Sequence, residues 1–442
     1  MDSSSKFISL FLGTFFLFAG NGLFLNSAGV KLAELDVSSL IIGGLNAAFF
    51  AGAIISTLVS HLVISRAGHI RSFVFFGALF AITALVYTMV ERLVFYGGLR
   101  FLLGFCYYSL LIIAESWMAE RSAVEKRAKV LAIYNITSYV ASILGVVLLN
   151  LHLENKDITT LSAILVMCGM LPIAITRMIA PSPPEPQRIS LPKMIGIVPL
   201  ALIGSFFAGL MVTGMFTMAS VFLIRQDFSV SQVSFYLSCA LVGGFLLQIP
   251  VARWSTQYGR RKTIFMSSFL SLVSSAIALY GTVYYPNAIY WQYICGFFIG
   301  CGIYTLYALC LARANDVLPN NMNTVDVSRS ILFSYGIGSL IAPILVGWAI
   351  TFSHTYGFYS IFIICSLFLV YCSATEKVRV PEEQRSDFVE IHGANSPALM
   401  EMDPRNDEEK DIPFDEDIIL EHIEHVQEDF EEQQAYDQEN KH

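Results

Sequence analysis

Twelve apolar runs of membrane-spanning length dominate the sequence between residues 7 and 374. A helix needs about 20 apolar residues to cross the hydrocarbon core of a bilayer. Inside that core every backbone polar group must be hydrogen-bonded within the protein, so runs of this length form helices. We predict spanning helices over residues 7–27, 38–64, 70–90, 93–117, 128–150, 159–179, 194–223, 231–254, 263–281, 289–312, 327–351 and 356–374. The predicted fold class is therefore an all-α integral membrane protein.

Charge is distributed unevenly along the chain. Charged residues make up only 14% of the sequence, against about 25% in a typical soluble protein. Residues 1–375 carry 13 acidic and 21 basic side chains, whereas residues 376–442 carry 22 acidic and 6 basic ones. We therefore expect a mildly basic membrane body, followed by an acidic cytoplasmic tail over residues 376–442 that is mostly disordered.

One part of this tail has a helical pattern. Ile419, Ile423, Val426 and Phe430 recur at helical spacing and would form the apolar stripe of a short amphipathic helix. Such a helix could dock on a basic cytoplasmic partner, although a solvated charged tail is the favoured interpretation. Two histidines among glutamates in this region are too loosely spaced to predict a metal site. The sequence indicates neither a metal nor a cofactor.

A proline-rich segment divides the body into two halves. Residues 180–193 hold five prolines and cannot be helical throughout. The flanking residues 1–179 and 194–375 each contain six predicted helices, and they repeat each other at a nearly constant offset. RAGHIRSF and QYGRRKTI, for example, align Gly68 with Gly259, which is 191 residues later. We predict two pseudo-symmetric six-helix bundles joined by a cytoplasmic linker over 180–193.

Basic residues predict the orientation of the body in the membrane. Cytoplasmic loops of membrane proteins carry an excess of Lys and Arg. With the N-terminus inside, sixteen basic residues before the tail fall in internal segments, and only Lys31, Arg92, Lys156 and Arg225 fall in external ones. Both termini are therefore predicted to be cytoplasmic.

Several motifs together resemble one known family. These motifs are AGHIRSF (67–73), the pair Arg100 and Gly104, AESWM (114–118), RAKVLAIYNI (127–136) and YTLYALCLARAND (304–316). They look like the YcaD-like branch of bacterial major facilitator transporters, over about residues 5–375. The resemblance implies a twelve-helix inner-membrane permease that alternates access by rocking two bundles, but it implies no particular substrate.

The family's signature between its second and third helices, roughly G-x-x-x-D-R-x-G-R-R, occurs here in two altered copies. Ser65 and Thr256 stand where the family carries an acid, so its charge latch cannot be transferred unchanged. Ordinary positive-inside loops are the alternative interpretation. By resemblance, we assign to a cytoplasmic gate the residues Arg66, Gly68, Arg71, Glu115, Gly259, Arg260, Arg261 and Asp316.

Arg100 lies inside the fourth predicted helix. An ionised group at the centre of a bilayer costs at least about 2.5–3.5 kcal/mol, so it usually faces a protein interior or a watery pathway. The resemblance associates an arginine on this helix with proton or substrate handling, and it could bind an anionic group. The alternative is snorkelling to the outer interface near Glu91 and Arg92. Glu115, on the same helix, is interpreted as a proton carrier, a gate acid or, as favoured, a partner of loop bases such as Arg121.

Uncharged polar residues recur inside the predicted helices of both halves. In a bilayer such groups face other helices, where they either bond those helices or line a cavity. Bonding between helices is the favoured role for any single residue, but the whole set predicts the lining of a central cavity. The candidates for the substrate pathway are Asn21, Asn46, Arg100, Tyr107, Tyr108, Asn135, Tyr139, Gln248, Gln292, Tyr304, Tyr307 and Tyr335.

These observations predict a secondary active transporter of a small organic solute in the cell inner membrane. The sequence has no ATP-binding or nucleophile motif, so we expect no enzyme activity. The absence of an ATP-binding motif, taken together with the resemblance, implies coupling to protons. Uptake is slightly favoured over export, because the fifth helix has Gly145 but lacks the proline of the exporter motif. A second hypothesis is a transporter-like sensor or scaffold whose acidic tail recruits a cytoplasmic partner. Nothing predicts binding to nucleic acid.

Overall fold

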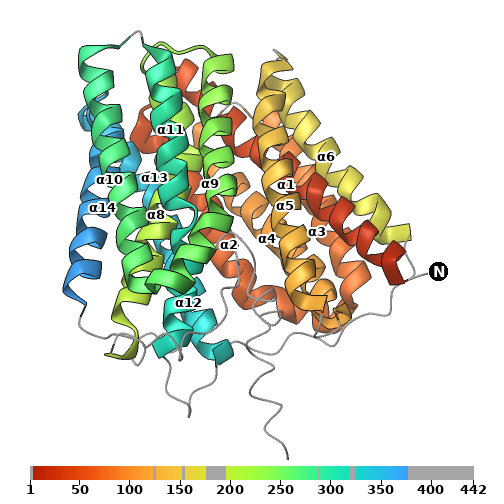
Figure 1. The fold of residues 1–442 in the computed structure, drawn as a ribbon. Helices are drawn as coiled ribbons and strands as arrows, with labels where there is room; N and C mark the ends of the chain where they lie inside the picture. Colours follow the sequence, from red (N-terminus) through yellow and green to blue (C-terminus); the bar gives the residue numbers. More distant parts are fainter. Residues whose placement is uncertain are drawn as a thin grey trace, which may run out of the picture. The chain divides into compact units, whose positions relative to one another are not determined.

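The computed structural model describes residues 3–90, 92–122, 126–151, 155–175, 196–286, 288–317 and 324–376, which all belong to one compact unit. Within these ranges the regular secondary structure is helical (Figure 1). Among the described residues, twelve segments are long and apolar enough to cross a membrane, so the predicted all-α fold with twelve spanning helices is confirmed. The predicted linker over 180–193 and the amphipathic stripe of the tail lie outside the described residues.

Six spans make up the first half of the chain. Their helices are α1 (Ser3–Glu34), α2 (Ser39–Ala67), α3 (His69–Met89), α4 (Leu93–Arg121), α5 (Arg127–Val147, extended by the 3₁₀ segment η2, Leu148–Leu151) and α6 (Asn155–Ile175). α1 packs against α5 and α6, α2 packs against α4, and α3 packs against α4 and α6. Each helix therefore has its main partners within this half, apart from the contacts described below.

The other six spans make up the second half. Their helices are α8 (Pro199–Ile224), α9 (Val230–Tyr258), α10 (Arg260–Tyr284), α11 (Ile289–Ile303) with α12 (Leu306–Val317), α13 (Thr324–Phe352) and α14 (Gly357–Thr375). α8 packs against α13, α9 against α11, and α10 against α11 and α14. These pairings correspond to those of α1 with α5, α2 with α4, and α3 with α4 and α6. The internal repeat of the sequence thus has a counterpart in helix packing, while the exact bundle boundaries stay predictions.

The two halves meet mainly along α2 with α13, α1 with α8, and α5 with α9. α2 and α13 approach most closely at glycines. A Cβ atom added to Gly43 would lie 2.1 Å from the carbonyl oxygen of Pro343, and one added to Gly347 would lie 2.4 Å from that of Ser39. Small residues of this kind let helix backbones touch inside a membrane. The contact between the halves therefore depends on these glycines.

The predicted tenth helix, 289–312, is interrupted in the structure. α11 and α12 are separated by a turn at Tyr304 and Thr305. Glycines such as Gly302 lower the helix propensity here, and the Thr305 hydroxyl donates to the Gly302 carbonyl at 3.3 Å, which competes with regular backbone bonding. The ring of Tyr304 then fits against Gly244, where a Cβ would lie 2.7 Å from it. The interruption therefore sets the position of Tyr304, which matters for the site.

Candidate functional site

A cavity lies between the two halves. It is lined from α1, α2, α4 and α5 on one side, and from α8, α9, α12, α13 and the turn between α11 and α12 on the other. Its volume is about 120 Å³. A site for a single water molecule needs roughly 10–15 Å³ by the same measure. The space is therefore large enough for a small organic solute.

Seven of the twelve predicted pathway residues line this cavity, and they come from both halves. They are Asn21, Tyr107, Tyr108, Tyr139, Tyr304, Tyr307 and Tyr335. The rings of Tyr139 and Tyr304 meet across the boundary between the halves, with 6.2 Å between their centroids. The structure thus brings together residues that are up to 314 positions apart in the sequence, from Asn21 to Tyr335.

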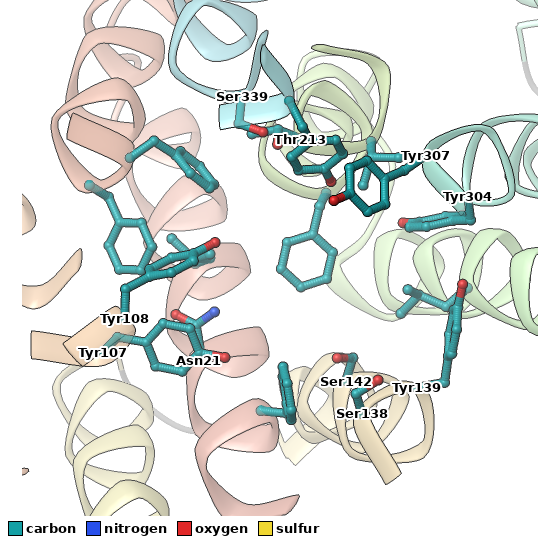
Figure 2. A pocket seen from close by; sticks show the side chains of 18 residues that line it. Asn21, Tyr107, Tyr108, Ser138, Tyr139, Ser142, Thr213, Tyr304, Tyr307 and Ser339 are labelled. Carbon is teal, nitrogen blue, oxygen red and sulfur yellow. The ribbon is translucent and has the colours of Figure 1, made fainter. Parts of the chain in front are cut away.

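The remaining tyrosines form pairs within each half. The ring centroids of Tyr107 and Tyr108 lie 5.4 Å apart, and those of Tyr307 and Tyr335 lie 5.1 Å apart. Both pairs meet edge to face, as aromatic rings prefer. Figure 2 shows Tyr107 and Tyr108 on one side of the cavity and Tyr307 on the other. The cavity therefore has an aromatic wall on each side.

Four hydroxyl residues of the lining were missed by the sequence analysis, namely Ser138, Ser142, Thr213 and Ser339. Ser138 and Ser142 flank Tyr139 at helical spacing, so the stripe formed with the predicted Asn135 could have revealed them. Thr213 and Ser339 carry no such signal, because Ser and Thr are common in spanning helices as partners of backbone carbonyls. The lining phenylalanines, Phe18, Phe49, Phe50 and Phe216, likewise resemble ordinary apolar residues of a membrane helix.

Arg100 and Asn46 lie outside the cavity lining and contact each other. The Arg100 side chain is fully buried, and its Nη1 donates to Asn46 Oδ1 at 2.8 Å while its Nε donates to the Tyr87 hydroxyl at 3.4 Å. Its guanidinium carbon lies 5.0 Å from the centroid of the Phe24 ring. Asn46 Nδ2 in turn donates to the Thr217 carbonyl of α8 at 3.4 Å. The cation is thus held by neutral partners and is linked through Asn46 to the second half.

Three further pathway candidates are buried but do not line the cavity, namely Asn135, Gln248 and Gln292. Gln292 stands 192 residues after Arg100, at its repeat position. Its Nε2 donates to Thr282 Oγ1 at 2.8 Å, and its Oε1 accepts from the Tyr359 hydroxyl at 2.6 Å. Gln292 therefore belongs to a neutral hydrogen-bonded network inside the second half.

Two of the predicted gate residues are glycines that form equivalent turns. Gly68 joins α2 to α3 and Gly259 joins α9 to α10, with φ angles of 78° and 88°. Only glycine adopts such angles without strain. Arg66 and Arg71, on either side of Gly68, are exposed. Both copies of the altered signature therefore form a tight turn at their glycine, whereas the role of these residues as a gate stays a prediction.

The second copy of the signature contains a buried ion pair. Arg260 Nε lies 3.2 Å from Asp316 Oδ2, and the two side chains are 0% and 1% exposed. Asp316 comes from α12, so a carboxylate distant in sequence pairs with the signature arginine although Thr256 has replaced the usual acid. Arg261 Nη1 donates to the backbone carbonyl of Glu376, just after α14. Three segments of the second half are thus joined at this end.

The first half has an aromatic contact at the equivalent position. His69 stands 191 residues before Arg260, and its ring lies against the indole of Trp117 with 5.7 Å between centroids. His69 and Trp117 are both buried. The two repeats therefore close the same helix turn with different chemistry, a ring contact in the first half and a charge pair in the second.

Glu115 is a fully buried carboxylate on α4. Its Oε1 accepts a hydrogen bond from the hydroxyl of Tyr134 on α5. The ring of Tyr134 meets Phe18 edge-on, with 5.8 Å between centroids, and Phe18 lines the cavity. Glu115 is therefore linked to the cavity lining through two aromatic rings, those of Tyr134 and Phe18.

Hydrogen bonds between the halves gather at the end of the molecule that was predicted to be external. Arg225 Nη1 lies 2.6 Å from Asp36 Oδ1, and its Nη2 donates to the Val37 carbonyl at 2.6 Å. Further bonds at this end join Ser38 to Thr351, Leu40 to Thr351, Asn150 to Ser234 and Ser234 to Val146. This end of the cavity is therefore bridged by direct contacts between the halves.

Comparison with known proteins places these features in a family. The chain matches the family model described as Major Facilitator Superfamily over residues 10–222 and 201–399. It is 23% identical over 315 residues to the MFS-type transporter YcaD of Escherichia fergusonii, covering 71% of this chain and 80% of that protein. Its fold is similar to a mutant of the nucleoside transporter NupG, with a TM-score of 0.71 at 14% identity over 84% of this chain and 99% of that chain. It is also similar to a D-xylose-proton symporter, with a TM-score of 0.64 at 13% identity over 86% and 98% of the two chains.

Proposed function

The chain belongs to the major facilitator superfamily, and on that basis we propose that it is a secondary active transporter of a small organic solute. The similar fold of a nucleoside transporter and of a xylose symporter supports a small organic molecule as the solute. In this proposal the two halves rock against each other, and the cavity between them opens alternately to the two sides of the membrane.

The main support comes from the position of the cavity. Both halves contribute side chains to its lining, so a relative motion of the halves would change both its shape and its access. Several polar contacts between the halves lie at one end, where Arg225 reaches Asp36 and Thr351 reaches Ser38. Breaking these contacts is the step that would open the cavity at that end.

We further propose that transport is coupled to protons, in the direction of uptake, in the bacterial cytoplasmic membrane with both termini inside. Glu115 is the group proposed to carry the proton, because a buried carboxylate can be neutralised and this one is linked to the cavity lining through Tyr134 and Phe18. Tyr134 can keep its hydrogen bond to either form of the carboxyl group. The similar fold of a proton symporter agrees with this proposal.

The coupling proposal is tested with Glu115→Gln in proteoliposomes. We expect solute exchange to continue while accumulation driven by a pH gradient falls to the equilibrium ratio, because glutamine cannot take up a proton. Both are measured with the solute that stabilises the protein most in a thermal-shift screen of metabolites. Tyr134→Phe, which removes the hydroxyl but leaves the carboxyl group, serves as the control and should retain accumulation. Normal accumulation by Glu115→Gln would contradict the role of this residue.

Alternating access is tested by cross-linking the bridged end. Ser38 and Thr351 have side-chain oxygens 3.4 Å apart, so the double variant Ser38→Cys with Thr351→Cys is placed to form a disulfide. Oxidation should abolish uptake and reduction should restore it, because the halves can no longer separate at this end. Each single variant under the same oxidant is the control for the chain's own cysteines. Full uptake by the cross-linked protein would contradict the mechanism. A sensor, the alternative function, would bind the solute without accumulating it.

A further inference from the structure

The lining of the cavity is aromatic and hydroxylated but uncharged. Its eighteen side chains include ten aromatic rings, ten hydroxyl groups and one amide, that of Asn21. Within the described parts of the chain, no Lys, Arg, His, Asp or Glu contributes to this lining. The cavity therefore offers ring surfaces and neutral hydrogen-bonding groups, but no countercharge for an ionised solute.

The nearest charged groups on α4 are engaged elsewhere. Arg100 lies seven residues before Tyr107, is fully buried and donates to Asn46. Glu115 lies seven residues after Tyr108, is also fully buried and accepts from Tyr134. A charged solute in the cavity would thus lose its hydration without gaining an ion pair, which is unfavourable.

The lining also presents an acceptor that needs a donor. Among the described residues nothing donates to the buried Asn21 Oδ1, although the same side chain is hydrogen-bonded to Tyr107. Such an acceptor costs free energy until a donor reaches it, and Figure 2 shows the amide beside Tyr107 and Tyr108 at the edge of the cavity. A hydroxyl or N–H group of a solute would satisfy it. A quaternary cation could sit against the ring faces, but it has no donor for Asn21.

The aromatic and hydroxyl side chains on the two sides of the cavity indicate the other chemical features of the solute. Tyr107 and Tyr108 stand on one side of the space and Tyr307 and Tyr335 belong to the other, so a flat ring can contact aromatic side chains from both halves. The surrounding hydroxyls can replace the hydrogen bonds that a polyhydroxylated solute makes with water. On the basis of the proposed transport function, we propose that the solute is uncharged and combines a flat ring with several hydroxyl or amide groups.

A matched set of small molecules tests this solute class. Phenyl β-D-glucoside has the neutral aromatic ring and the hydroxyls. Phenyl β-D-glucuronide carries a carboxylate in place of the hydroxymethyl group, phenyl 2-amino-2-deoxy-β-D-glucoside carries an ammonium group in place of the 2-hydroxyl, and methyl β-D-glucoside lacks the aromatic ring. The four compounds are screened with a metabolite library by the thermal shift of the purified full chain. We expect the neutral ring compound to give the largest shift of the four and the strongest library ligands to be neutral and ring-bearing. A stronger shift from a charged compound, or none from any neutral ring compound, would overturn the proposal.

Variants then locate the binding site. Asn21→Leu and Tyr335→Phe each remove one neutral hydrogen-bonding group and should weaken the affinity for the best neutral ligand roughly tenfold. Tyr280→Phe removes the hydroxyl of a side chain that is 52% exposed on the outside of the bundle, and it should leave the affinity unchanged. Equal affinities in all three variants would overturn the assignment to this cavity. Binding without flux would instead contradict the transport function, and flux of a charged solute would contradict only the solute class.

Discussion

The two halves carry different chemistry at one repeat position. In the first half Arg100 is fully buried among Asn46, Tyr87 and the ring of Phe24, and no carboxylate of the described residues lies within ion-pair distance of it. In the second half Gln292 occupies the equivalent place, and its amide is bonded to Thr282 and Tyr359. One half thus holds a charge where the other holds a neutral network.

This difference shows whether the fold requires a charged side chain at this repeat position. The network around Gln292 shows that a neutral amide can fill the position with its hydrogen bonds satisfied. Packing therefore does not require the charge of Arg100, and burying a charge without a countercharge is costly. We infer that Arg100 serves the conformational change, because its partner Asn46 contacts the backbone of α8 in the other half.

Placing a positive charge at the equivalent position of the second half should have the largest effect on stability. Gln292→Arg would bury a cation among Thr282, Tyr359 and Tyr236, a group without a carboxylate. We expect a loss of roughly 3–5 kcal/mol in stability, the magnitude of an uncompensated buried charge. The midpoint of thermal unfolding in detergent measures it, with the neutral Gln292→Met as the control. A midpoint equal to that of the control would show that this half tolerates the charge as well as the first half does.

Breaking the ion pair between Arg260 and Asp316 in the second half should have the second-largest effect on stability. Asp316→Asn leaves Arg260 buried without its countercharge and should cost about 3 kcal/mol. The combined change of Arg260→Met and Asp316→Leu should recover most of this loss, because apolar groups of similar size need no partner. In the first half, His69→Phe keeps the ring contact with Trp117 and should cost less than about 1.5 kcal/mol. Equal losses of stability in Asp316→Asn and His69→Phe would contradict the proposed difference between the ion pair of the second half and the ring contact of the first.

Making the first half resemble the second should reduce transport more than stability. Arg100→Gln removes the charge but can still bond Asn46, so we expect uptake to fall about 100-fold, or ~2.7 kcal/mol, with a small change in unfolding midpoint. Arg100→Lys should restore little uptake, because an ammonium group lacks the planar fork that reaches both Asn46 and Tyr87. Uptake is measured in proteoliposomes at matched protein density. Near-normal uptake by either variant would contradict a role of Arg100 in the conformational change.

The smallest effect on stability is expected at the end predicted to be external, where Arg225 contacts Asp36. Arg225→Ala removes the ion pair with Asp36, whose side chain is 91% exposed, and the hydrogen bond to the Val37 carbonyl, so the loss of stability should be about 1–2 kcal/mol. Asp36→Asn, measured in the same unfolding assay, should give a similarly small loss. A loss of several kcal/mol in either variant would mean that this exposed pair stabilises the fold as much as the buried pair of Arg260 does.

Much of the fold was predictable from local sequence. The apolar runs are local signals, and the twelve spanning helices followed from them. The interruption at Tyr304 was missed, because a hydropathy run does not reveal a two-residue turn inside it. For the site, counting polar residues within helices found seven of the cavity residues, but it could not separate these from Arg100 or Gln292. All of them are polar groups at membrane depth, and only packing distinguishes a lining position from a position inside one half.

The sequence alone determined the number of spans, the internal repeat and the family resemblance, because hydrophobicity, glycine placement and motif spacing are properties of short segments. The tertiary structure decided which groups meet. Asp316 replaces a missing acid for Arg260 because α12 passes beside the start of α10, and Arg100 is excluded from the cavity because Asn46 and Tyr87 hold its guanidinium. Such pairings depend on contacts between distant segments, and these exist only once the helices have packed.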